Sequence, residues 1–327
     1  MQERSLSAVE GEVWNKVKMK VLVADPIDKK AFDAIKKFAQ VKDATKLSRA
    51  SLAKEIAKHD VLIVRSRTEV DEKLLSKAKK LKGVVRAGVG TDNIDTEYCQ
   101  DHKIQVLNTP EAPSVSVAEL TIGLMLSLFR KIPQADAATK NKKWLKGELK
   151  GNELFGKTLG IIGFGRIGPQ VAQRARAFRM QVFIYDNRAN SAQVREFGEL
   201  VNLPELLKRS DIITVHLPLT PETENMLMDE QFKLMKDGVY IINTARGPII
   251  NEQSLIKALK SGKVAGAALD VYWGETPFKS KIMKFKDKII LTPHIGASTY
   301  EAQERIGDLL VEKVRQLARD DKYIQWS

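Results

Sequence analysis

The sequence predicts an α/β protein with two doubly wound parallel-sheet domains, and three observations lead to this fold class. Short apolar runs rich in β-branched residues alternate with segments of helical period along most of the chain, which is typical of parallel strands joined by crossover helices. The alternation forms two separate series. The length of 327 residues also fits two compact domains, because single hydrophobic cores seldom exceed about 300 residues.

The first series begins at Met19 and predicts one parallel sheet. Its apolar runs are KVLVAD, DVLIVRS, GVVRAG and IQVLN, and helical segments are expected at 29–39, 72–80 and 93–102. The prolines of NTPEAP end the series, and a helix-compatible stretch from 115 to about 139 is interpreted as the bridge to the next domain. We assign residues 19–113 to the first domain and regard residues 1–18 as an N-terminal extension.

The second series predicts a second parallel sheet. Its runs are apolar enough to be buried on both faces of a sheet, and they read TLGIIGFG, QVFIYD, DIITVHLP, GVYIINTA, KVAGAALD and KIILTPH. A final helix pattern at 300–318 follows the completed sheet, and we expect it to pack back on the first domain. Residues 300–327 therefore join residues 19–113, and residues 114–299 form a domain inserted between them.

The composition excludes several classes of protein. With 43% hydrophobic and 29% charged residues, the chain is neither disordered nor of low complexity. Its longest apolar runs, such as 120–129, are shorter than the roughly 20 residues that cross a bilayer, so no membrane helix is expected. The single cysteine, Cys99, cannot form an internal disulfide, and no Cys/His cluster predicts a metal site.

The N-terminus and the charge balance narrow the assignment further. The first eighteen residues contain acidic side chains and no apolar core segment, so they fit neither a secretory signal nor a transit peptide, and a cytoplasmic protein is expected. The net charge of +13 could serve nucleic acid, a membrane surface or small anions. Because the basic residues are spread along the chain without a nucleic-acid-binding motif, we expect solvated helix faces and neither of the first two partners.

Residues 163–168 read GFGRIG, which predicts a dinucleotide-binding turn between a strand and a helix. Gly163 permits the tight turn, Gly165 lets the backbone approach a pyrophosphate, and Gly168 lets helix and strand pack closely. Asp186 ends the next strand and is placed to accept hydrogen bonds from a ribose, which favours NAD over NADP because its charge repels a 2′-phosphate. Arg188 two positions later works against that preference.

Two further patterns are a second glycine-containing loop and the positions of the histidines. The GVG of 88–90 also follows a strand, but Asn93 stands where a third glycine is needed, so we interpret it as a loop. Of the four histidines, His59 and His102 lie in lysine-flanked stretches and are predicted to be surface residues. His216 either contacts a cofactor or simply packs. His294 follows IILTP at the carboxyl end of a strand, where open α/β sheets bind ligands, and it is the predicted base.

Seven segments together resemble the D-isomer-specific 2-hydroxyacid dehydrogenases: RAGVGTDNID, SVAEL, GKTLGIIGFGRIG, VHLPLTPET, INTARGPIINE, AGAALDV and PHIGAST. The similarity runs from residue 19 to about 318 and is closest to the phosphoglycerate dehydrogenase branch. It implies a Rossmann-type dinucleotide domain inserted in a flavodoxin-like substrate-binding domain. It also implies a homodimer built through the dinucleotide domains and residues 115–139, although the apolar residues of that segment could equally be intramolecular core.

The resemblance assigns three catalytic residues. Arg246 would pair with the substrate carboxylate and polarise the C2 oxygen, His294 would exchange the hydroxyl proton, and Glu275 would orient and stabilise the charged imidazole. Thr276 separates Glu275 from Pro277, whereas the family commonly has Glu followed at once by Pro. The cofactor-binding residues that the resemblance and the motifs predict are Val89, Gly163, Gly165, Arg166, Ile167, Gly168, Asp186, His216, Leu217, Pro218, Thr223, Thr244, Ala245, Arg246, Asp270, His294, Gly296 and Ala297.

The predicted substrate is a small anionic 2-hydroxy or 2-oxo acid that carries a phosphate. The resemblance places at the substrate Arg65, Ser66, Arg86, Gly88, Val89, Gly90 and Arg246. Two guanidinium groups and a hydroxyl from the first domain suit a phosphate, which needs several charge-assisted donors. The expected reaction is therefore the NAD-dependent oxidation of 3-phosphoglycerate to 3-phosphohydroxypyruvate, the first step of serine biosynthesis.

Two alternatives remain open. A reductase of glyoxylate, hydroxypyruvate or another D-2-hydroxy acid would share every catalytic residue, and the missing amide at Pro113, where many phosphoglycerate dehydrogenases carry Asn-Ser, puts the substrate in doubt. A more distant alternative is an NAD-sensing corepressor. The chain ends nine residues after Ala318, so we expect a short form without a C-terminal regulatory domain and without inhibition by serine.

Overall fold

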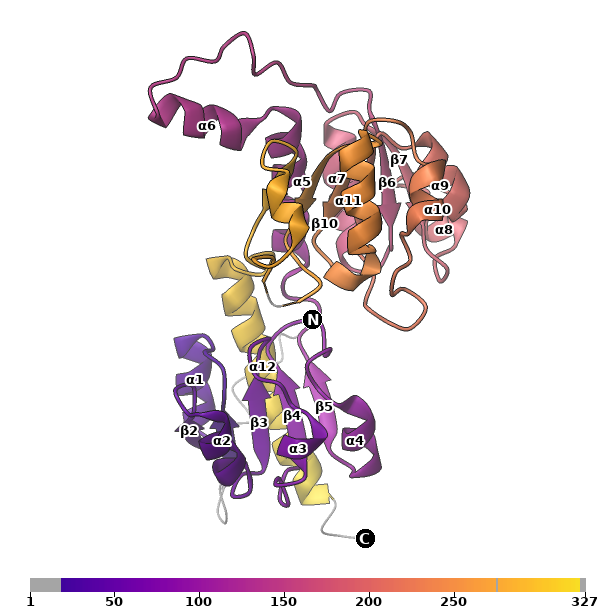
Figure 1. Cartoon of the computed structure of the whole chain (residues 1–327). Helices are drawn as coiled ribbons and strands as arrows, with labels where there is room; N and C mark the ends of the chain where they lie inside the picture. Colours follow the sequence, from indigo (N-terminus) through magenta and orange to yellow (C-terminus); the bar gives the residue numbers. More distant parts are fainter. Residues whose placement is uncertain (1–18, 275, 324–327) are drawn as a thin grey trace, which may run out of the picture. The chain divides into compact units, whose positions relative to one another are not determined.

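The computed structural model describes residues 19–274 and 276–323, with side chains described as far as residue 319. Within these residues the chain forms two compact units (Figure 1). Unit 1 contains residues 19–112 and 303–323, and unit 2 contains Pro113–Ala302. Each unit has one all-parallel sheet, so the predicted fold class is confirmed.

Unit 1 has a five-stranded sheet with the flavodoxin-like order β2-β1-β3-β4-β5. Its elements are β1 (Lys20–Val23), α1 (Lys29–Lys36), β2 (Gln40–Asp43), α2 (Arg49–Ile56), β3 (Val61–Val64), α3 (Glu72–Leu75), β4 (Gly83–Arg86), α4 (Thr96–Asp101) and β5 (Gln105–Asn108). Two of these elements, β2 and α2, were not predicted from the sequence. Because β2 is an exposed edge strand with the sequence QVKD, it lacks the apolar run that marks the buried strands.

Helices cover both faces of this sheet. One face is packed by α2, α3 and α4, whose apolar residues form a core with those of β1, β3 and β4. On the other face lies α12 (Tyr300–Tyr323): a Cβ on Gly83 of β4 would come within 2.6 Å of Leu317, and one on Gly307 within 3.1 Å of Ala31 in α1. Lys30 and Glu304 form an ion pair at 2.6 Å between α1 and α12. The terminal helix therefore packs on unit 1.

Unit 2 has a seven-stranded sheet with the order β12-β11-β10-β9-β6-β7-β8, which is the Rossmann order with one added strand. The strands are β6 (Thr158–Ile162), β7 (Gln181–Tyr185), β8 (Glu199–Leu200), β9 (Ile212–Val215), β10 (Val239–Asn243), β11 (Val264–Leu269) and β12 (Ile289–Leu291). The helices are α5 (Ser114–Phe129), α6 (Ile132–Lys140), α7 (Ile167–Ala177), α8 (Ser191–Val194), α9 (Leu203–Arg209), α10 (Asp229–Leu234) and α11 (Glu252–Ser261), with the 3-10 turns η2 (Gly247–Ile249) and η3 (Lys281–Lys284).

The prediction of one continuous helical stretch at 115–139 is wrong, because α5 and α6 are separate helices. Lys131 between them adopts a left-handed conformation with φ of +52°. Pro133 lies in the first turn of α6, where its missing N–H costs no hydrogen bond within the helix, so a new helix can begin there. Figure 1 shows α6 extending away from the sheet of unit 2, and none of the residues of α6 is buried.

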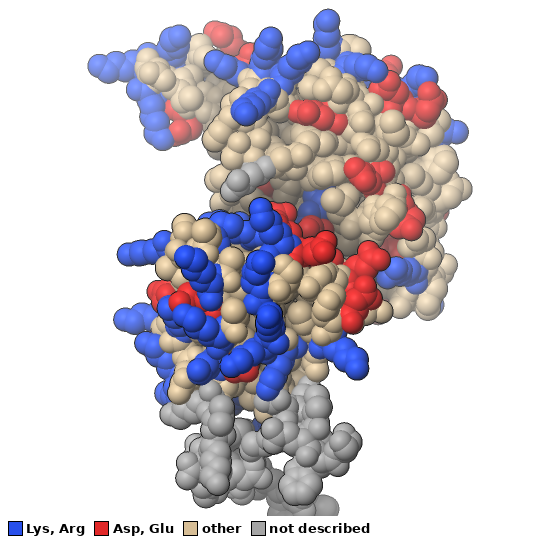
Figure 2. Space-filling view, turned by 60° about the horizontal axis from the view of Figure 1, so that its bottom comes forward, with Lys and Arg blue, Asp and Glu red and all other residues tan. Residues whose placement is uncertain are grey.

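Two features concern the binding of anions and insertion into a membrane: the charge on the surface of unit 1 and the lengths of the apolar helices. Lys and Arg side chains cover much of the visible face of unit 1, with acidic side chains among them (Figure 2), and several are paired, as Lys42 is with Glu55 at 2.7 Å. Such a surface attracts anions over roughly a Debye length, about 8 to 10 Å. Among the described residues, no helix has the length and apolarity needed to span a membrane.

Candidate active site

The glycine turn joins β6 to α7 at the carboxyl edge of the seven-stranded sheet. Gly163 has φ of +99°, and a Cβ there would approach the His216 backbone to 2.7 Å. A Cβ on Gly168 would lie 2.5 Å from the Gly163 carbonyl oxygen, whereas one on Gly165 would meet nothing within 4 Å. Two glycines therefore close the turn tightly, and the third leaves open space at the start of α7, where backbone N–H groups favour a phosphate.

Asp186 follows β7 and holds the glycine turn directly. Its Oδ2 accepts a hydrogen bond from the Phe164 backbone N–H at 2.7 Å, and its Oδ1 accepts from the N–H groups of Arg188 and Ala189 at 2.7 and 3.1 Å. A carboxylate has about four acceptor positions, so it keeps capacity for a ribose hydroxyl. Asp186, which is predicted to bind the ribose, thus also supports the glycine turn that would bind the pyrophosphate.

His216 follows β9 and lies against the glycine turn. The side chain is buried, and its Nε2 lies 3.0 Å from the Thr214 hydroxyl. Its Nδ1 is also buried and has no hydrogen-bond partner among the described residues. Burial lowers the pKa of His216 to about 3, so the ring is neutral. Because an unsatisfied buried polar atom is costly, its position beside Gly163 favours a cofactor contact over simple packing.

The loop that follows His216 is held by its own hydrogen bonds. The Thr223 hydroxyl donates to the Pro218 carbonyl at 2.7 Å and accepts from the Thr220 N–H at 2.8 Å. Leu217 borders the glycine turn, because a Cβ on Gly163 would lie 3.0 Å from its Cδ2. The structure therefore brings Leu217 next to the glycine turn, and Thr223 holds the loop that follows Leu217.

Arg246 lies in the turn after β10, where local hydrogen bonds fix its backbone. The Asn243 amide donates to the Arg246 carbonyl at 2.9 Å, and its Oδ1 accepts from the Ala245 N–H at 3.0 Å. A Cβ on Gly247 would overlap the backbone of Tyr272, so the next residue after Arg246 must be glycine. The turn is thereby pressed against the segment that follows β11.

His294 lies in the loop after β12, and Asp270 holds that loop. The buried Asp270 carboxylate accepts from the Thr292 hydroxyl at 2.6 Å and from the N–H groups of Ile295 and Gly296 at 2.9 and 2.8 Å. His294 is exposed and has φ of +54°. That conformation is uncommon for a non-glycine residue and persists where the surroundings over-determine it. Asp270 therefore supports the loop that carries His294, the predicted base.

Helix α5 supports the same loops from beneath. The Ser116 hydroxyl lies 2.9 Å from the Gly296 carbonyl oxygen, and the Thr244 hydroxyl lies 3.0 Å from that of Thr121. Since Thr121 donates to the Val117 carbonyl at 2.8 Å, Thr244 is the donor in the second bond. The predicted site residues Thr244, Arg246, Asp270, His294 and Gly296 therefore share one edge of unit 2, together with the glycine turn. Glu275 lies outside the described residues.

Unit 1 has a cluster of charged and polar residues at the carboxyl edge of its sheet, which we call the unit 1 cluster: Asp25, Arg65, Ser66, Arg67, Arg86 and Asn93. Asp25, after β1, is fully buried and accepts from the N–H groups of Arg65 and Thr68 at 2.6 and 3.1 Å, and from the Thr68 hydroxyl at 2.7 Å. These bonds fix the loop after β3. They join the loops after β1 and β3, which is the switch point of a 2-1-3-4-5 sheet where ligands bind.

The two arginines of this loop differ in what they contact. The guanidinium of Arg67 donates to the carbonyls of Ala24 and Thr45 at 2.7 and 2.8 Å, so it is a structural group. The half-buried guanidinium of Arg65 has no hydrogen-bond partner among the described residues, and burial lowers its pKa from the ordinary value although the Asp25 carboxylate opposes this. The exposed Ser66 lies between them. A cation that is partly desolvated and unpaired in this way suits an anionic ligand.

Arg86, by contrast, is buried and already engaged. Its Nε donates to the Asn93 Oδ1 at 3.3 Å and its Nη1 to the Ala87 carbonyl at 3.1 Å. The Asn93 amide donates in turn to the carbonyls of Arg65 and Thr68 at 2.8 and 2.6 Å. Asn93 therefore connects the loops after β3 and β4. From the sequence, Asn93 was interpreted only as a failed third glycine, and no pattern in one sequence signals such a bridge.

The loop of residues 88–90 is shaped by Arg86. A Cβ on Gly88 would overlap the Arg86 guanidinium, and the Val89 carbonyl accepts from the Asn108 amide at 2.6 Å. Val89 itself is exposed. Gly88 and Val89 thus adjoin the unit 1 cluster by contacts, and Gly90 follows them in the same loop.

The prediction that His59 is a surface residue is wrong. His59 is buried, and its Nδ1 lies 2.7 Å from the Glu55 carbonyl oxygen; the helix end around it shields the ring despite the neighbouring lysine. His102 is exposed and stacks on Tyr98 with ring centroids 3.8 Å apart.

Cys99 is buried, and burial together with the nearby Asp95 charge raises its pKa to about 11. No group of metal-binding side chains occurs among the described residues.

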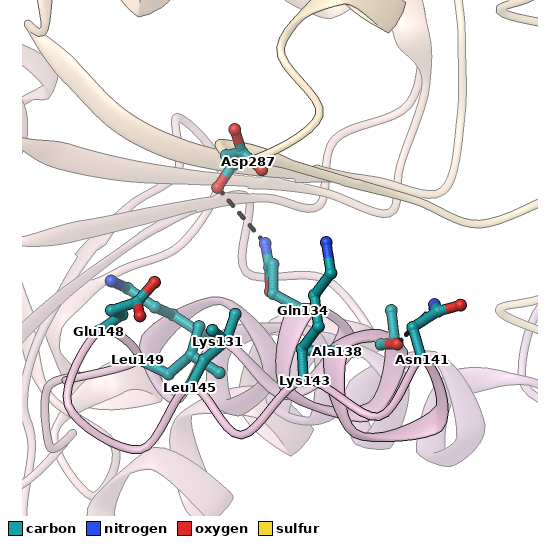
Figure 3. Close-up of a pocket in the computed structure, with 10 residues that line it drawn as sticks. Lys131, Gln134, Ala138, Asn141, Lys143, Leu145, Glu148, Leu149 and Asp287 are labelled. Carbon is teal, nitrogen blue, oxygen red and sulfur yellow. Dashed lines mark hydrogen bonds between the residues drawn. The ribbon is translucent and has the colours of Figure 1, made fainter.

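A cavity of about 700 Å³ lies elsewhere in unit 2 (Figure 3). It is formed by α6, by the segment that follows this helix, and by Asp287, whose carbonyl accepts from the Gln134 amide at 3.3 Å. None of the predicted site residues lines it. The candidate site is therefore defined by the loops at the sheet edges and not by this cavity.

Comparison with known proteins places the chain in a family. Residues 122–296 match the model of the NAD-binding domain of the D-isomer specific 2-hydroxyacid dehydrogenases. The chain is 46% identical over 305 residues to D-3-phosphoglycerate dehydrogenase of Methanocaldococcus jannaschii, covering 93% of this chain and 58% of the relative. It is 45% identical over 299 residues to hydroxypyruvate reductase of Thermotoga maritima, covering 90% and 97%.

A solved structure agrees with these relatives. D-lactate dehydrogenase from Aquifex aeolicus, complexed with NAD and lactic acid, matches with a TM-score of 0.82 and 34% identity over 93% of this chain and 96% of that one. The chain belongs to the D-isomer specific 2-hydroxyacid dehydrogenase family, so the resemblance and the prediction of an NAD-binding oxidoreductase domain are confirmed. The chain spans 58% of the length of the M. jannaschii relative.

Proposed function

We propose that this chain catalyses the NAD-dependent oxidation of D-3-phosphoglycerate to 3-phosphohydroxypyruvate. The observation that carries the substrate choice is the half-buried Arg65 guanidinium, which has no hydrogen-bond partner among the described residues. A phosphate offers it several charge-assisted acceptors, and the hydroxyl of Ser66 adds a donor. A substrate without phosphate would leave this cation desolvated and unpaired. The name of the M. jannaschii relative supports the same substrate.

The cofactor fits the edge of unit 2 that carries the glycine turn. The open space at Gly165, the unsatisfied Nδ1 of His216 and the remaining acceptor positions of Asp186 suit the phosphates, a polar group and a ribose of NAD respectively. NAD supplies a hydride acceptor in oxidation and a hydride donor in reduction. The residues around it supply binding, orientation and electrostatics.

The chain's own residues supply the remaining chemistry. Arg246 binds the substrate carboxylate with its planar guanidinium, which also stabilises charge on the C2 oxygen. His294 removes the hydroxyl proton when the alcohol is oxidised and returns it in the reverse reaction. The family resemblance assigns to Glu275, which lies outside the described residues, the role of favouring and orienting the protonated imidazole. Asp270 holds the loop of His294 through three hydrogen bonds, which keeps the base in place.

A second candidate is the reduction of hydroxypyruvate or glyoxylate. The T. maritima relative is named for the first of these reactions, and the alignment covers nearly its whole length. Every catalytic residue named above serves that reaction equally. Arg65 is the group that separates the two proposals, because a phosphorylated substrate has a second anionic group, besides its carboxylate, that can pair with it.

The test compares substrates and one arginine variant. We expect kcat/KM with NAD to be at least about 100-fold higher for 3-phosphoglycerate than for D-glycerate, since charge-assisted hydrogen bonds contribute about 1.5 to 3 kcal/mol each. Arg65→Gln should abolish most of this preference by raising KM for the phosphorylated substrate, whereas Lys77→Gln, at an exposed position of the same unit, should not. Equal rates on both substrates, or faster turnover of glyoxylate or hydroxypyruvate with NADH, would favour the second candidate.

We also propose that two copies associate through α6 and the segment after it. Ile132 and Trp144 are exposed to 49% and 81%, and association through this segment would remove their apolar surface from water. Light scattering should give the mass of a dimer, and Trp144→Glu should shift it toward the monomer. A monomer at all concentrations would exclude this assembly.

A further inference from the structure

Tyr272 connects the two turns that carry Arg246 and His294, although no motif drew attention to it. It lies two residues after Asp270, in the segment that follows β11. Its side chain is half-buried and packs against the core on one face of the seven-stranded sheet. The loops after β10 and β12 flank this segment, because these strands are the neighbours of β11.

On the side of His294, the Tyr272 hydroxyl donates to the Thr292 carbonyl oxygen at 2.7 Å. The same oxygen accepts the backbone N–H of His294 at 3.0 Å. The hydroxyl is also within 3.2 Å of the Leu269 carbonyl oxygen. One acceptor atom therefore joins Tyr272 to the peptide group of the proposed base, and it does so where His294 adopts its left-handed conformation.

On the side of Arg246, the contact is made by backbone. Gly247 lies so close to the Tyr272 peptide that a Cβ there would overlap it. The next residue, Trp273, donates its Nε1–H to the Ile250 carbonyl at 2.5 Å. The segment 272–273 is thus attached at two places to the turn that begins at Arg246.

Resting on the catalytic roles proposed above, we propose that Tyr272 is a positioning residue that sets His294 relative to Arg246. Its backbone is fixed against the Arg246 turn, and its hydroxyl holds the carbonyl that anchors His294. Burial, with a smaller effect from the Asp270 charge, raises the pKa of Tyr272 to about 12, so the hydroxyl remains a donor throughout the working range of pH. Asp270 fixes the far part of the His294 loop and the Thr292 side chain, and Tyr272 holds the Thr292 carbonyl.

The test uses Tyr272→Phe, which removes the hydroxyl alone, with Tyr240→Phe as the matched control. Tyr240 is a half-buried tyrosine of β10 whose hydroxyl has no hydrogen bond within the described part of the chain. We expect kcat of Tyr272→Phe to fall about tenfold, because small displacements of a catalytic group cost up to about 100-fold in rate. The KM values for substrate and NAD should stay within about twofold, since Arg246 and the glycine turn keep their backbone contacts.

A second measurement does not depend on turnover. The chain has four histidines, so NMR can follow each imidazole in the free protein, with His294→Gln used for assignment. Tyr272→Phe should shift or broaden the signals of His294 and leave those of His216 unchanged, and Tyr240→Phe should move neither. An unmoved His294 signal, an unchanged kcat, or a rise in KM that equals the loss in kcat/KM overturns the proposal. If no tested substrate is turned over, the proposed reaction fails but the NMR result still decides the role of Tyr272.

Discussion

Asp25 and Arg67 form an ion pair in which the Asp25 side chain is fully buried and the Arg67 side chain is 55% exposed, with Oδ1 and Nε 3.1 Å apart. Because only the carboxylate is buried, loss of Asp25 should destabilise the protein more than loss of Arg67. Besides Arg67 it serves two backbone N–H groups and the Thr68 hydroxyl. It therefore stabilises the loop that presents Arg65.

We expect Asp25→Ala to lower the free energy of unfolding by about 2 to 4 kcal/mol, because it leaves several buried donors without an acceptor. Asp33→Ala, at an exposed position of α1, should change it by less than about 0.5 kcal/mol. Urea unfolding followed by circular dichroism measures both. Equal effects of the two substitutions would mean that the Asp25 network contributes nothing measurable.

Gly165→Ala should separate stability from cofactor binding. A Cβ at Gly165 meets no atom within 4 Å, so we expect the thermal midpoint to change by no more than about 2 °C. The added methyl group occupies the space into which a pyrophosphate must come, so the dissociation constant of NAD should rise at least about tenfold. Fluorescence titration with NADH tests this, and unaltered affinity would place the pyrophosphate elsewhere.

Asp186→Ala should weaken NAD binding and improve NADP relative to it. The substitution removes the charge that repels a 2′-phosphate, and it also removes the acceptor of the Phe164 N–H, so the absolute affinity for both cofactors should fall. The ratio of kcat/KM for NAD to that for NADP is the quantity to measure. A native protein that already prefers NADP would show that Arg188 decides the preference.

His216 should make the stability of the protein depend on pH. Its pKa of about 3 in the folded protein lies below the unfolded value of about 6.5, so the unfolded chain binds the proton more readily. The stabilising contribution of the neutral ring is complete above about pH 6.5 and is lost as the pH falls toward 3, by about 2 kcal/mol between pH 7 and pH 5.

The comparison of His216→Gln with the native protein measures this contribution. The difference in unfolding free energy between pH 7 and pH 5 should be smaller in His216→Gln, whereas His102→Gln, at an exposed position, should leave it unaltered. An equal pH dependence in all three proteins would mean that His216 titrates normally.

His294→Ala should lower kcat by about 10² to 10⁴, the usual contribution of a general acid or base. NADH binding should stay nearly intact, because the glycine turn and Asp186 are separate from the loop of His294 and keep their own hydrogen bonds. Steady-state kinetics together with NADH titration distinguish these effects. A small loss of turnover would mean that another group moves the proton.

Much of the fold follows from local patterns in the sequence. Buried parallel strands such as β3 and β9 are apolar throughout or nearly so, and each is therefore visible by itself. The edge strands β2 and β8 were missed because one side of an edge strand faces solvent and its residues need not be apolar. The break between α5 and α6 was missed because Pro133 is tolerated in the first turn of a helix and Lys131 gives no signal for its left-handed conformation.

The residues of the candidate site also differ in whether a local sequence pattern reveals them. GFGRIG and Asp186 could be singled out in the sequence because their spacing reflects a single turn and the following strand. Asn93 and Tyr272 act through contacts between residues that are far apart in the chain, and those contacts exist only after the parallel strands are arranged. His59 was misassigned for a related reason, since lysine neighbours describe the exposed side of a helix end and not the face that the ring occupies.

Unit 1 is assembled from two stretches of chain that are separated by the roughly 190 residues of unit 2. A ribosome that adds about 5 to 20 residues per second therefore completes the strands of unit 1 about 10 to 40 s before it delivers α12. During that interval the face of the sheet around Gly83 lacks the cover that Leu317 provides. We expect the nascent chain to bind chaperones through this face and to release them only after α12 has been synthesised.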